Sequence, residues 1–206
     1  MNRNSISIEN NQTRFKPPTL NGKGFRLVPL NRDNLSLLHK WESDPSSLYL
    51  YTLRKDILSR EEYIEVMTSR LKGYYHVFFV ILNQKDKPVG FIYTYDANLI
   101  DGFTFATTFL EPESRRLGLG AKAGLLFYDY LFSYYPLRKI YCDVFEYNRE
   151  SFSALKHAGF EIEGEFREHR FFQGKYHMMY RLALYRGRFY KKFGSMVQRV
   201  VLNNIP

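Results

Sequence analysis

A glycine-containing turn between a predicted strand and a predicted helix is the feature that most limits what this chain can fold into. The turn, Arg115 to Gly120 (Arg-Arg-Leu-Gly-Leu-Gly), follows the apolar run Phe103 to Leu110, and Ala121 to Tyr134 after it has helix-compatible spacing. Backbone N–H groups at a helix N-terminus attract anions, and glycine lets a phosphate approach the backbone. The turn therefore predicts a site for a phosphate-bearing ligand. An ordinary helix start with solvated arginines would show the same pattern.

The order of the other predicted elements indicates an α+β domain with a mixed, mostly antiparallel sheet. Seven strands are expected, at 25–30, 76–82, 89–95, 103–110, 139–145, 161–172 and 175–185, with about four helices flanking them. A strand–helix–strand crossover makes its two strands parallel or splayed apart at one end. The crossover here contains the glycine turn, so we expect a splayed central strand pair with a ligand in the opening.

Composition narrows the class of protein. The chain has 206 residues, which suits one domain, and a net charge of +9, which favours anionic partners. No run approaches the roughly 18 apolar residues of a membrane span. The single cysteine, Cys142, excludes an internal disulfide and fits a reducing compartment, so a cytoplasmic location is expected. The histidines have no metal-ligand spacing with one another or with Cys142, and no metal is expected.

The basic excess is concentrated at the C-terminus. Residues 181–206 contain six arginines and lysines and no acid, with aromatic residues between them. This pattern is typical of a helix that packs on its own domain through aromatic anchors, but contact with nucleic acid or a membrane surface stays an alternative. We therefore expect an extended N-terminal arm over 1–24, a domain over 25–185 and a basic aromatic extension over 186–206.

Four motifs occur in an order that resembles a known family. They are R-x-x-G-x-G at Arg115 to Gly120, Asn148-Arg149-Glu150-Ser151 followed by Gly159-Phe160, Glu163-Gly164 followed by the stretch from Phe171 to His177, and Trp41 with Asp44-Pro45. Together they resemble the GNAT superfamily of acyl-CoA-dependent N-acetyltransferases. The branch is the one that acetylates ribosomal-protein N-termini, polyamines and amino sugars.

The resemblance implies a fold, a co-substrate and a set of binding residues. It implies a GNAT-like sheet with acetyl-CoA held at the splayed strands and the glycine turn, the backbone of the turn holding the pyrophosphate. The residues implied in CoA binding are Phe109, Leu110, Arg115, Arg116, Leu117, Gly118, Leu119, Gly120, Ala121, Asn148 and Ser151. The side chain of Asn148 could equally cap a helix.

The resemblance also implies catalytic groups. Ser151 is the expected acid for the leaving thiolate, and Glu168 is a candidate base. A water chain could replace a dedicated base. Three positions depart from the family pattern: Phe105 stands where many relatives have glutamate, Leu155 where polyamine relatives have tyrosine, and Met178 where relatives often have aspartate.

The expected reaction is direct transfer of an acetyl group from acetyl-CoA to a primary amine. A basic chain is poorly suited to a polycation, so the charge favours an amino sugar or a nucleotide-linked amino sugar. A protein N-terminus or a polyamine is the alternative acceptor, and a homodimer is a possible assembly. The alternative from another class is a non-catalytic CoA-fold module that binds nucleic acid or membrane through 186–206.

Overall fold

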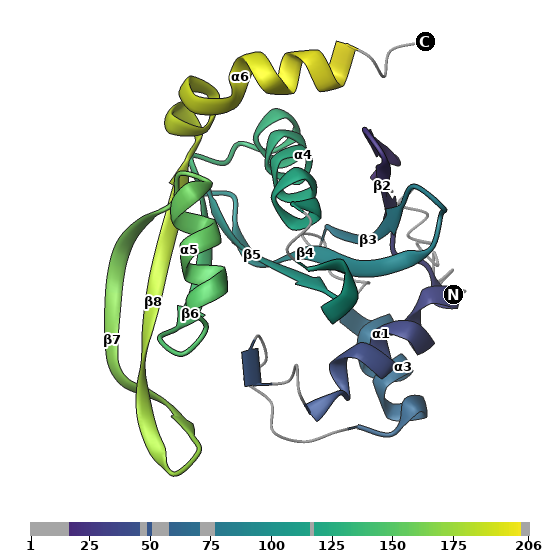
Figure 1. Cartoon of the computed structure of the whole chain (residues 1–206), viewed down its shortest axis with the longest axis vertical. Helices are drawn as coiled ribbons and strands as arrows, with labels where there is room; N and C mark the ends of the chain where they lie inside the picture. The colour runs from purple at the N-terminus through teal and green to yellow at the C-terminus, as the bar shows by residue number, and fades with distance from the viewer. Residues whose placement is uncertain (1–16, 46–48, 51–57, 71–76, 116–117, 203–206) are drawn as a thin grey trace, which may run out of the picture.

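The computed structural model describes residues 17–45, 49–50, 58–70, 77–115 and 118–202. Its eight strands form one sheet in the order β1-β2-β3-β4-β5-β6-β8-β7, antiparallel except for the β5–β6 pair (Figure 1). The strands are β1 Leu20–Gly22, β2 Phe25–Pro29, β3 Phe78–Asn83, β4 Pro88–Asn98, β5 Phe103–Leu110, β6 Lys139–Phe145, β7 Glu161–Phe172 and β8 Lys175–Tyr185. The described α-helices are α1 Leu35–Glu42, α3 Arg60–Arg70, α4 Leu119–Tyr134, α5 Arg149–His157 and α6 Arg186–Leu202.

The mixed, mostly antiparallel sheet is confirmed, with two differences in detail. Leu20–Gly22, which we expected in an extended arm, pairs with β2 and becomes an eighth strand. The reversal between them is possible because Gly24 has φ 81, a left-handed value that suits glycine. Five described α-helices replace about four, because the C-terminal basic segment forms α6.

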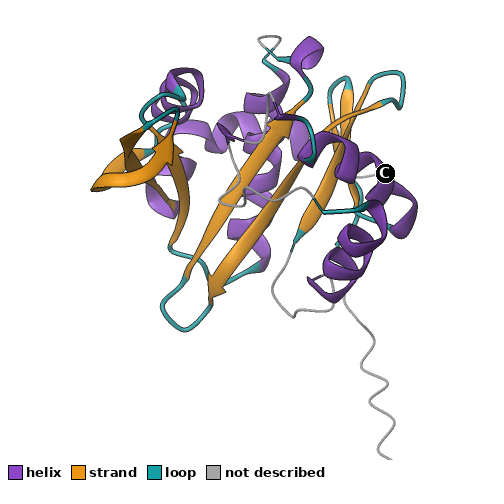
Figure 2. Ribbon diagram, turned by 90° about the horizontal axis from the view of Figure 1, so that it is seen from below, coloured by secondary structure: helices purple, strands orange, loops and turns teal. Residues whose placement is uncertain are grey.

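Helices lie on both faces of the sheet (Figures 1 and 2), and an apolar cluster packs against each face. On one face, Phe79 of β3 and Leu182 of β8 share a cluster with Phe127 of α4 and Phe189 of α6. On the other, Trp41 of α1 and residues of α3 pack against β3, β4 and the end of β5. Within the described residues this second cluster extends along the sheet only as far as β5, and Tyr49 contacts Tyr147 and Phe172 beyond it.

The α3 helix begins with the capping box that Ser59 and Glu62 predict. The Ser59 N–H donates to the Glu62 carboxylate at 2.9 Å, and the Glu62 N–H donates to the Ser59 hydroxyl at 3.2 Å. These bonds lower the pKa of Glu62. The helix then buries Tyr63 and Met67 in the second cluster.

The parallel pair β5–β6 is joined along only part of its length. Phe103 to Phe105 pairs with Lys139 to Tyr141, whereas β5 continues to Leu110 and β6 to Phe145. We call the two diverging segments, 106–110 and 142–145, the fork. At its base the Cys142 thiol donates to the Ala106 carbonyl oxygen at 3.3 Å. The expected splayed strand pair is therefore present.

The α6 helix packs against α4 through aromatic residues. Phe189 is buried and lies 5.5 Å from the Phe132 ring, centroid to centroid. The Tyr190 hydroxyl donates to Asp129 at 3.2 Å. Some basic side chains of α6 also bind the domain, since Arg188 pairs with Glu161 and the Lys192 ammonium donates to the His157 carbonyl oxygen at 2.6 Å. Among the described helices none is long and apolar enough to cross a membrane.

Candidate active site

The glycine turn leads directly into the N-terminus of α4. Gly118 is the N-cap residue, has φ 71 and is exposed, and a Cβ built on it would meet nothing within 4 Å. The N–H groups of Leu119, Gly120 and Ala121 lie in the first helical turn, where no intrahelical acceptor is available. They can therefore bind an anion, as the sequence predicts. Arg116 and Leu117 of the predicted set lie outside the described residues.

Arg115 is fixed to the end of β5. Its Nε donates to the Leu110 carbonyl oxygen at 2.8 Å, and its guanidinium lies 5.7 Å from the centroid of the Phe109 ring. The side chain is thus half-buried beside the fork, where its charge acts on an anion bound at the turn.

Strand alternation decides which backbone groups of β5 face the fork. The Glu111 N–H donates to the Val89 carbonyl oxygen at 2.9 Å, which directs the backbone of Glu111 toward the strand neighbour β4. Hydrogen-bonding direction alternates along a strand, so the backbone N–H and C=O groups of Phe109 also point toward β4. The backbone groups of Leu110, Thr108 and Ala106 point the other way, toward the fork. Of the two predicted positions, Leu110 therefore directs its backbone toward the fork, where its carbonyl oxygen accepts from the Arg115 Nε, and Phe109 directs its backbone toward β4. The Phe109 ring instead packs in the core, and Thr108 is a position that the sequence motif did not single out.

The opposite side of the fork ends at the N-terminus of α5. Asn148 is the N-cap: its Oδ1 accepts the Ser151 N–H at 3.3 Å, and its Nδ2 donates to the Leu50 carbonyl oxygen at 3.5 Å. The capping alternative for Asn148 is therefore observed. Ser151 lies half-buried in the first turn. Figure 1 shows that the N-termini of α4 and α5 follow the two strands that the fork separates.

Glu168 lies elsewhere. It is exposed, has φ 49, and falls where the β7–β8 register shifts between Phe166 and Arg170. In the strand order β8 separates β7 from β6, so the structure does not place Glu168 at the fork with Ser151. The roles of both residues remain predictions from the family resemblance.

An aromatic row forms the floor at the base of the fork. The Phe105 ring lies 5.3 Å from Tyr95 on one side and 5.1 Å from Tyr141 on the other, centroid to centroid. Burial raises the pKa of Tyr95, and the negative charge of Asp143 raises it further. Phe105 therefore replaces the glutamate of many relatives with an apolar surface.

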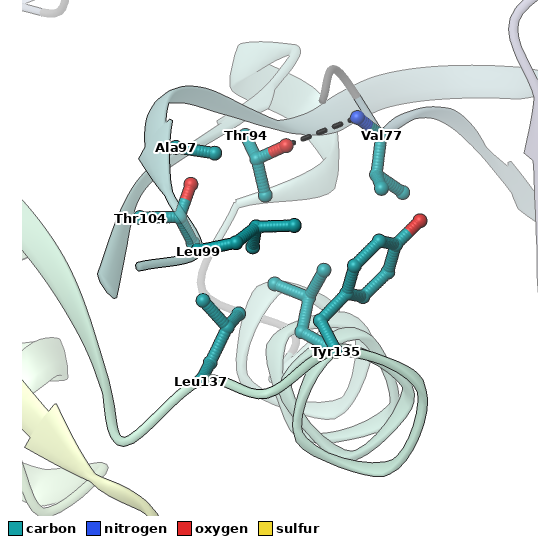
Figure 3. A pocket seen from close by; sticks show the side chains of 8 residues that line it. Val77, Thr94, Ala97, Leu99, Thr104, Tyr135 and Leu137 are labelled. Carbon is teal, nitrogen blue, oxygen red and sulfur yellow. Dashed lines mark hydrogen bonds between the residues drawn. The ribbon is translucent and has the colours of Figure 1, made fainter. Parts of the chain in front are cut away.

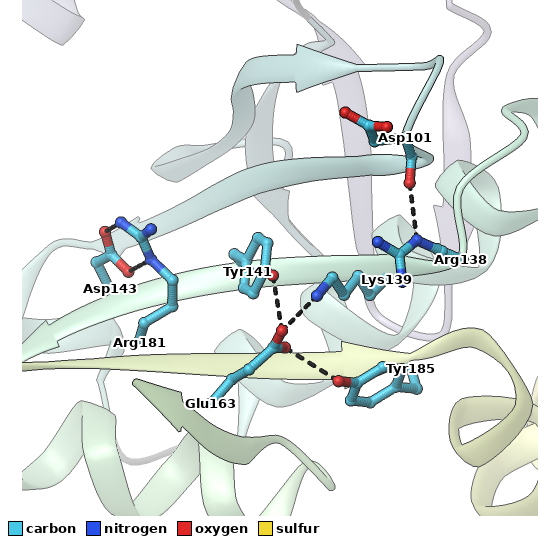
Figure 4. Close-up of polar contacts among 8 residues, drawn as sticks. All are labelled: Asp101, Arg138, Lys139, Tyr141, Asp143, Glu163, Arg181 and Tyr185. Atoms are coloured by element: carbon cyan, nitrogen blue, oxygen red, sulfur yellow. Dashed lines mark hydrogen bonds and ion pairs between the residues drawn. The ribbon is translucent and has the colours of Figure 1, made fainter. Parts of the chain in front are cut away.

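An ion pair that the sequence motifs did not predict lies over this floor (Figure 4). The Arg181 Nε donates to Asp143 Oδ1 at 2.8 Å and its Nη2 to Oδ2 at 2.7 Å. The same guanidinium lies 4.6 Å from the Phe105 ring centroid and 5.6 Å from that of Tyr141. The bidentate hydrogen bond raises the pKa of Arg181. The only sequence signal was the alternation of Tyr141, Asp143 and Phe145 on one strand face, which gives no hint of the partner on β8.

A second polar cluster lies at the paired end of β6. The Glu163 carboxylate accepts from the Tyr141 hydroxyl at 2.9 Å, from the Tyr185 hydroxyl at 3.1 Å and from the buried Lys139 ammonium (Figure 4). Burial opposes ionisation of Glu163, but the hydrogen bonds from Lys139 and the two hydroxyls outweigh it and lower its pKa. Lys139 pairs with Phe103, where β5 and β6 are still joined. This cluster holds β6, β8 and β7 together, and of its members only Tyr141 also belongs to the aromatic floor at the base of the fork.

Two other features carry no catalytic group. Cys142 is buried in the main core cluster, and burial raises the pKa of its thiol to about 12, so it serves as a small core residue. Figure 3 shows a small hollow between β4, β5 and the end of α4. Its Thr94 hydroxyl accepts the Val77 N–H at 3.0 Å and its Thr104 hydroxyl donates to the Tyr95 carbonyl oxygen at 3.1 Å. Within the described ranges, no three His, Cys, Asp or Glu side chains gather in a group that could hold a metal ion.

Comparison with known proteins agrees with the overall fold. Residues 25–161 match the family model of the acetyltransferase (GNAT) domain. The chain belongs to the GNAT acetyltransferase family. As a member of this family it is an N-acetyltransferase that uses acetyl-CoA, as the sequence motifs predicted.

Individual relatives are distant. The chain is 23% identical over 164 residues to spermidine N(1)-acetyltransferase of Escherichia coli (strain K12), covering 80% of this chain and 87% of the relative. A Vibrio cholerae spermidine N-acetyltransferase solved with CoA and spermine superposes with a TM-score of 0.76 at 21% identity, covering 81% of this chain and 98% of that one. The RimL ribosomal L7/L12 alpha-N-protein acetyltransferase, solved with CoA, gives 0.74 at 14% identity, with 82% and 98% covered. At these identities the solved structures support the fold of this GNAT protein and leave its acceptor open.

Proposed function

We propose that this acetyltransferase acetylates the α-amine at the N-terminus of a protein or peptide. The observation that carries the proposal is the charge balance at the fork. Asp143 is the only acid in the segments 106–110 and 142–145, and Arg181 already neutralises it through both carboxylate oxygens. A polycation is bound best by several unpaired carboxylates, whereas a single amine on a peptide needs one acceptor group and an otherwise neutral wall.

The geometry supplies the parts that direct acetyl transfer requires. The first N–H groups of α4 and the charge of Arg115 would hold the pyrophosphate of acetyl-CoA. The backbone of Leu110, Thr108 and Ala106 would pair with the amides of the pantetheine arm in the fork. The amine nitrogen then attacks the thioester carbon and gives up a proton to a water chain, and the carbon–sulfur bond breaks. The leaving thiolate takes a proton from Ser151 at the α5 N-terminus, the proposed donor, and the Ser151 hydroxyl regains its proton from the same water chain.

A polyamine is the second candidate, because the E. coli relative is named for spermidine. Against it, Leu155 stands where polyamine relatives carry a tyrosine, and Leu155 is partly buried against the main core. The amino-sugar acceptor expected from net charge has no support from these relatives, whose names give spermidine or a ribosomal protein.

A thiol-release assay with acetyl-CoA decides between the acceptors. We would compare a peptide with a free N-terminus, the same peptide with a blocked N-terminus, spermidine and a nucleotide-linked amino sugar. We expect turnover of the free peptide to be at least about 10-fold faster, in kcat/KM, than that of spermidine or the amino sugar. Lysine-free peptides make the blocked form inert. Faster turnover of spermidine or the amino sugar would reject the peptide acceptor.

We further propose that 25–185 carries the transfer, in the cytoplasm, with 186–206 as a packed extension of the domain. A homo-oligomer is also proposed, since one relative, the V. cholerae spermidine acetyltransferase, has been solved as a dodecamer. Light scattering on the whole chain measures the assembly, and a monomer at micromolar concentration would reject it.

A further inference from the structure

We infer that Asp143, oriented by Arg181, is the group that binds the acceptor amine at the fork. The inference rests on the proposed function only in that an amine must reach the fork, and it holds for any of the amine acceptors considered above. It assigns a substrate-binding role to a residue that neither the motif pattern nor the predicted site residues include.

Position is the first argument. Asp143 lies on β6 two residues beyond Tyr141, the last residue that pairs with β5, so it is on the diverging part of the strand. Its side chain lies on the same face as Tyr141 and bonds to the residue opposite it on β8, Arg181. The carboxylate is therefore at the fork, on the sheet face away from α4.

Orientation is the second argument. The Arg181 guanidinium donates to both carboxylate oxygens and lies over the Phe105, Phe166 and Tyr141 rings at 4.6, 5.1 and 5.6 Å. A guanidinium held by a bidentate pair and by ring faces has little freedom, so the carboxylate is fixed before a substrate arrives.

Electrostatics is the third argument. The Asp143 side chain is 19% exposed and that of Arg181 31%, so the pair is partly withdrawn from water while an edge of the carboxylate stays accessible. Each carboxylate oxygen can accept a second hydrogen bond besides the one from Arg181. A primary ammonium has three N–H donors and fits this acceptor.

Asp143→Asn tests the assignment, because the amide keeps the shape and still accepts one bond from Arg181 while the charge is lost. We expect the acceptor KM to rise roughly 10- to 100-fold, with kcat changed far less, because a charge-assisted hydrogen bond to the substrate is weakened. The Kd for CoA, measured by isothermal titration, should stay within about twofold. Arg181→Lys, which keeps the charge but loses the bidentate donor geometry, should raise the acceptor KM by a smaller factor and carries the same readout should Asp143→Asn not fold.

Glu163→Gln is the matched control. It removes a carboxylate on β7, which β8 separates from β6, and this carboxylate also binds a cation, but at the paired end of β6. Among the described residues, Glu163 reaches the aromatic floor only through the Tyr141 hydroxyl, so its replacement should change the acceptor KM far less than Asp143→Asn does. The inference is overturned if Asp143→Asn leaves the acceptor KM within about twofold of the wild-type value. It is also overturned if Asp143→Asn weakens CoA binding as much as acceptor binding, or if Glu163→Gln raises the acceptor KM as much as Asp143→Asn does.

The two proposals fail separately. Preference for spermidine over the peptide would reject the proposed function, and the Asp143 test would then be made with spermidine. If the peptide is acetylated and Asp143→Asn leaves the acceptor KM unaffected, only the role of Asp143 in binding the amine would be rejected. A wild-type protein that acetylates no amine would reject both.

Discussion

Gly118 offers the sharpest test of where the donor binds. A side chain at this position would extend into open space, since a Cβ meets nothing within 4 Å, and that space is where the turn would hold the pyrophosphate. Gly118→Ala should therefore lower affinity for CoA without disrupting the core. The replacement also strains the backbone, because Gly118 has φ 71 and an alanine in the left-handed region costs about 1–2 kcal/mol.

The size of each effect can be estimated separately. A strain of about 1–2 kcal/mol corresponds to a fall in Tm of roughly 2–8 °C for a chain of this length. Displacement of the phosphate from one or two charge-assisted N–H bonds costs about 1.5–3 kcal/mol each, or roughly 10- to 100-fold in Kd for one bond. Gly118→Asn separates the two effects, because asparagine tolerates a left-handed backbone and still fills the space.

Gly24→Ala is the matched control. Gly24 has φ 81 and equally open surroundings, but it lies in the β1–β2 turn. It should show a similar fall in Tm by thermal melting and no change in the Kd for CoA by isothermal titration. The placement of the pyrophosphate is refuted if Gly118→Ala and Gly118→Asn both bind CoA as the wild type does, or if Gly24→Ala weakens CoA equally.

Three further predictions concern stability and reactivity. Ser59→Ala should lower stability by about 0.5–2 kcal/mol in chemical denaturation, because it removes the acceptor for the Glu62 N–H at the start of α3; an unchanged midpoint would show that the capping box contributes nothing. Cys142 should resist alkylation in the native state at about pH 8, because a pKa of about 12 leaves roughly one thiol in ten thousand ionised. It should react once the chain is unfolded, and fast labelling of the native protein would contradict its burial. Burial raises the pKa of Asp129 above its usual value, so the folded state binds this proton more tightly. Stability therefore falls as the pH rises from the usual carboxyl pKa to the folded pKa, and the loss is complete above the folded pKa. Asp129→Asn, which still accepts from Tyr190, should therefore raise the Tm near neutral pH and have no effect below the usual carboxyl pKa, and a lower Tm at neutral pH would contradict this expectation.

Much of the fold followed from local signals in the sequence. The capping box at Ser59 and Glu62, the Gln173-Gly174 hairpin and the glycine turn each depend on residues close together in the chain. The observed φ values of Gln173 and Gly174, 50 and 80, are the left-handed values that such a two-residue turn requires. The short β1 strand escaped prediction because three polar or small residues carry no periodicity, and only pairing with β2 makes them a strand.

The site was predicted unevenly for the same reason. The glycine turn is a contiguous motif, so its position at the α4 N-terminus follows from the amino-acid sequence alone. The Asp143–Arg181 pair joins residues 38 apart in the chain and exists only because β6 and β8 are neighbours. Phe109 shows a further limit of the sequence motif. The motif indicates the right strand, but strand alternation decides which residues direct their backbone groups toward the fork.

The fork gives this sheet an edge in its interior. Edge strands normally carry unpaired N–H and C=O groups at the outside of a protein, where another chain can pair with them. Here the backbone of Ala106, Thr108 and Leu110 faces the gap between β5 and β6, although the carbonyl oxygens of Ala106 and Leu110 already accept from the Cys142 thiol and the Arg115 Nε. Such a gap admits a narrow ligand arm far more readily than a whole chain. The amide hydrogens of Thr108 and Leu110 should exchange with solvent as loop amides do in the free protein. CoA would then act as a temporary strand: it would slow that exchange and join β6, β8 and β7 to the five strands on the other side.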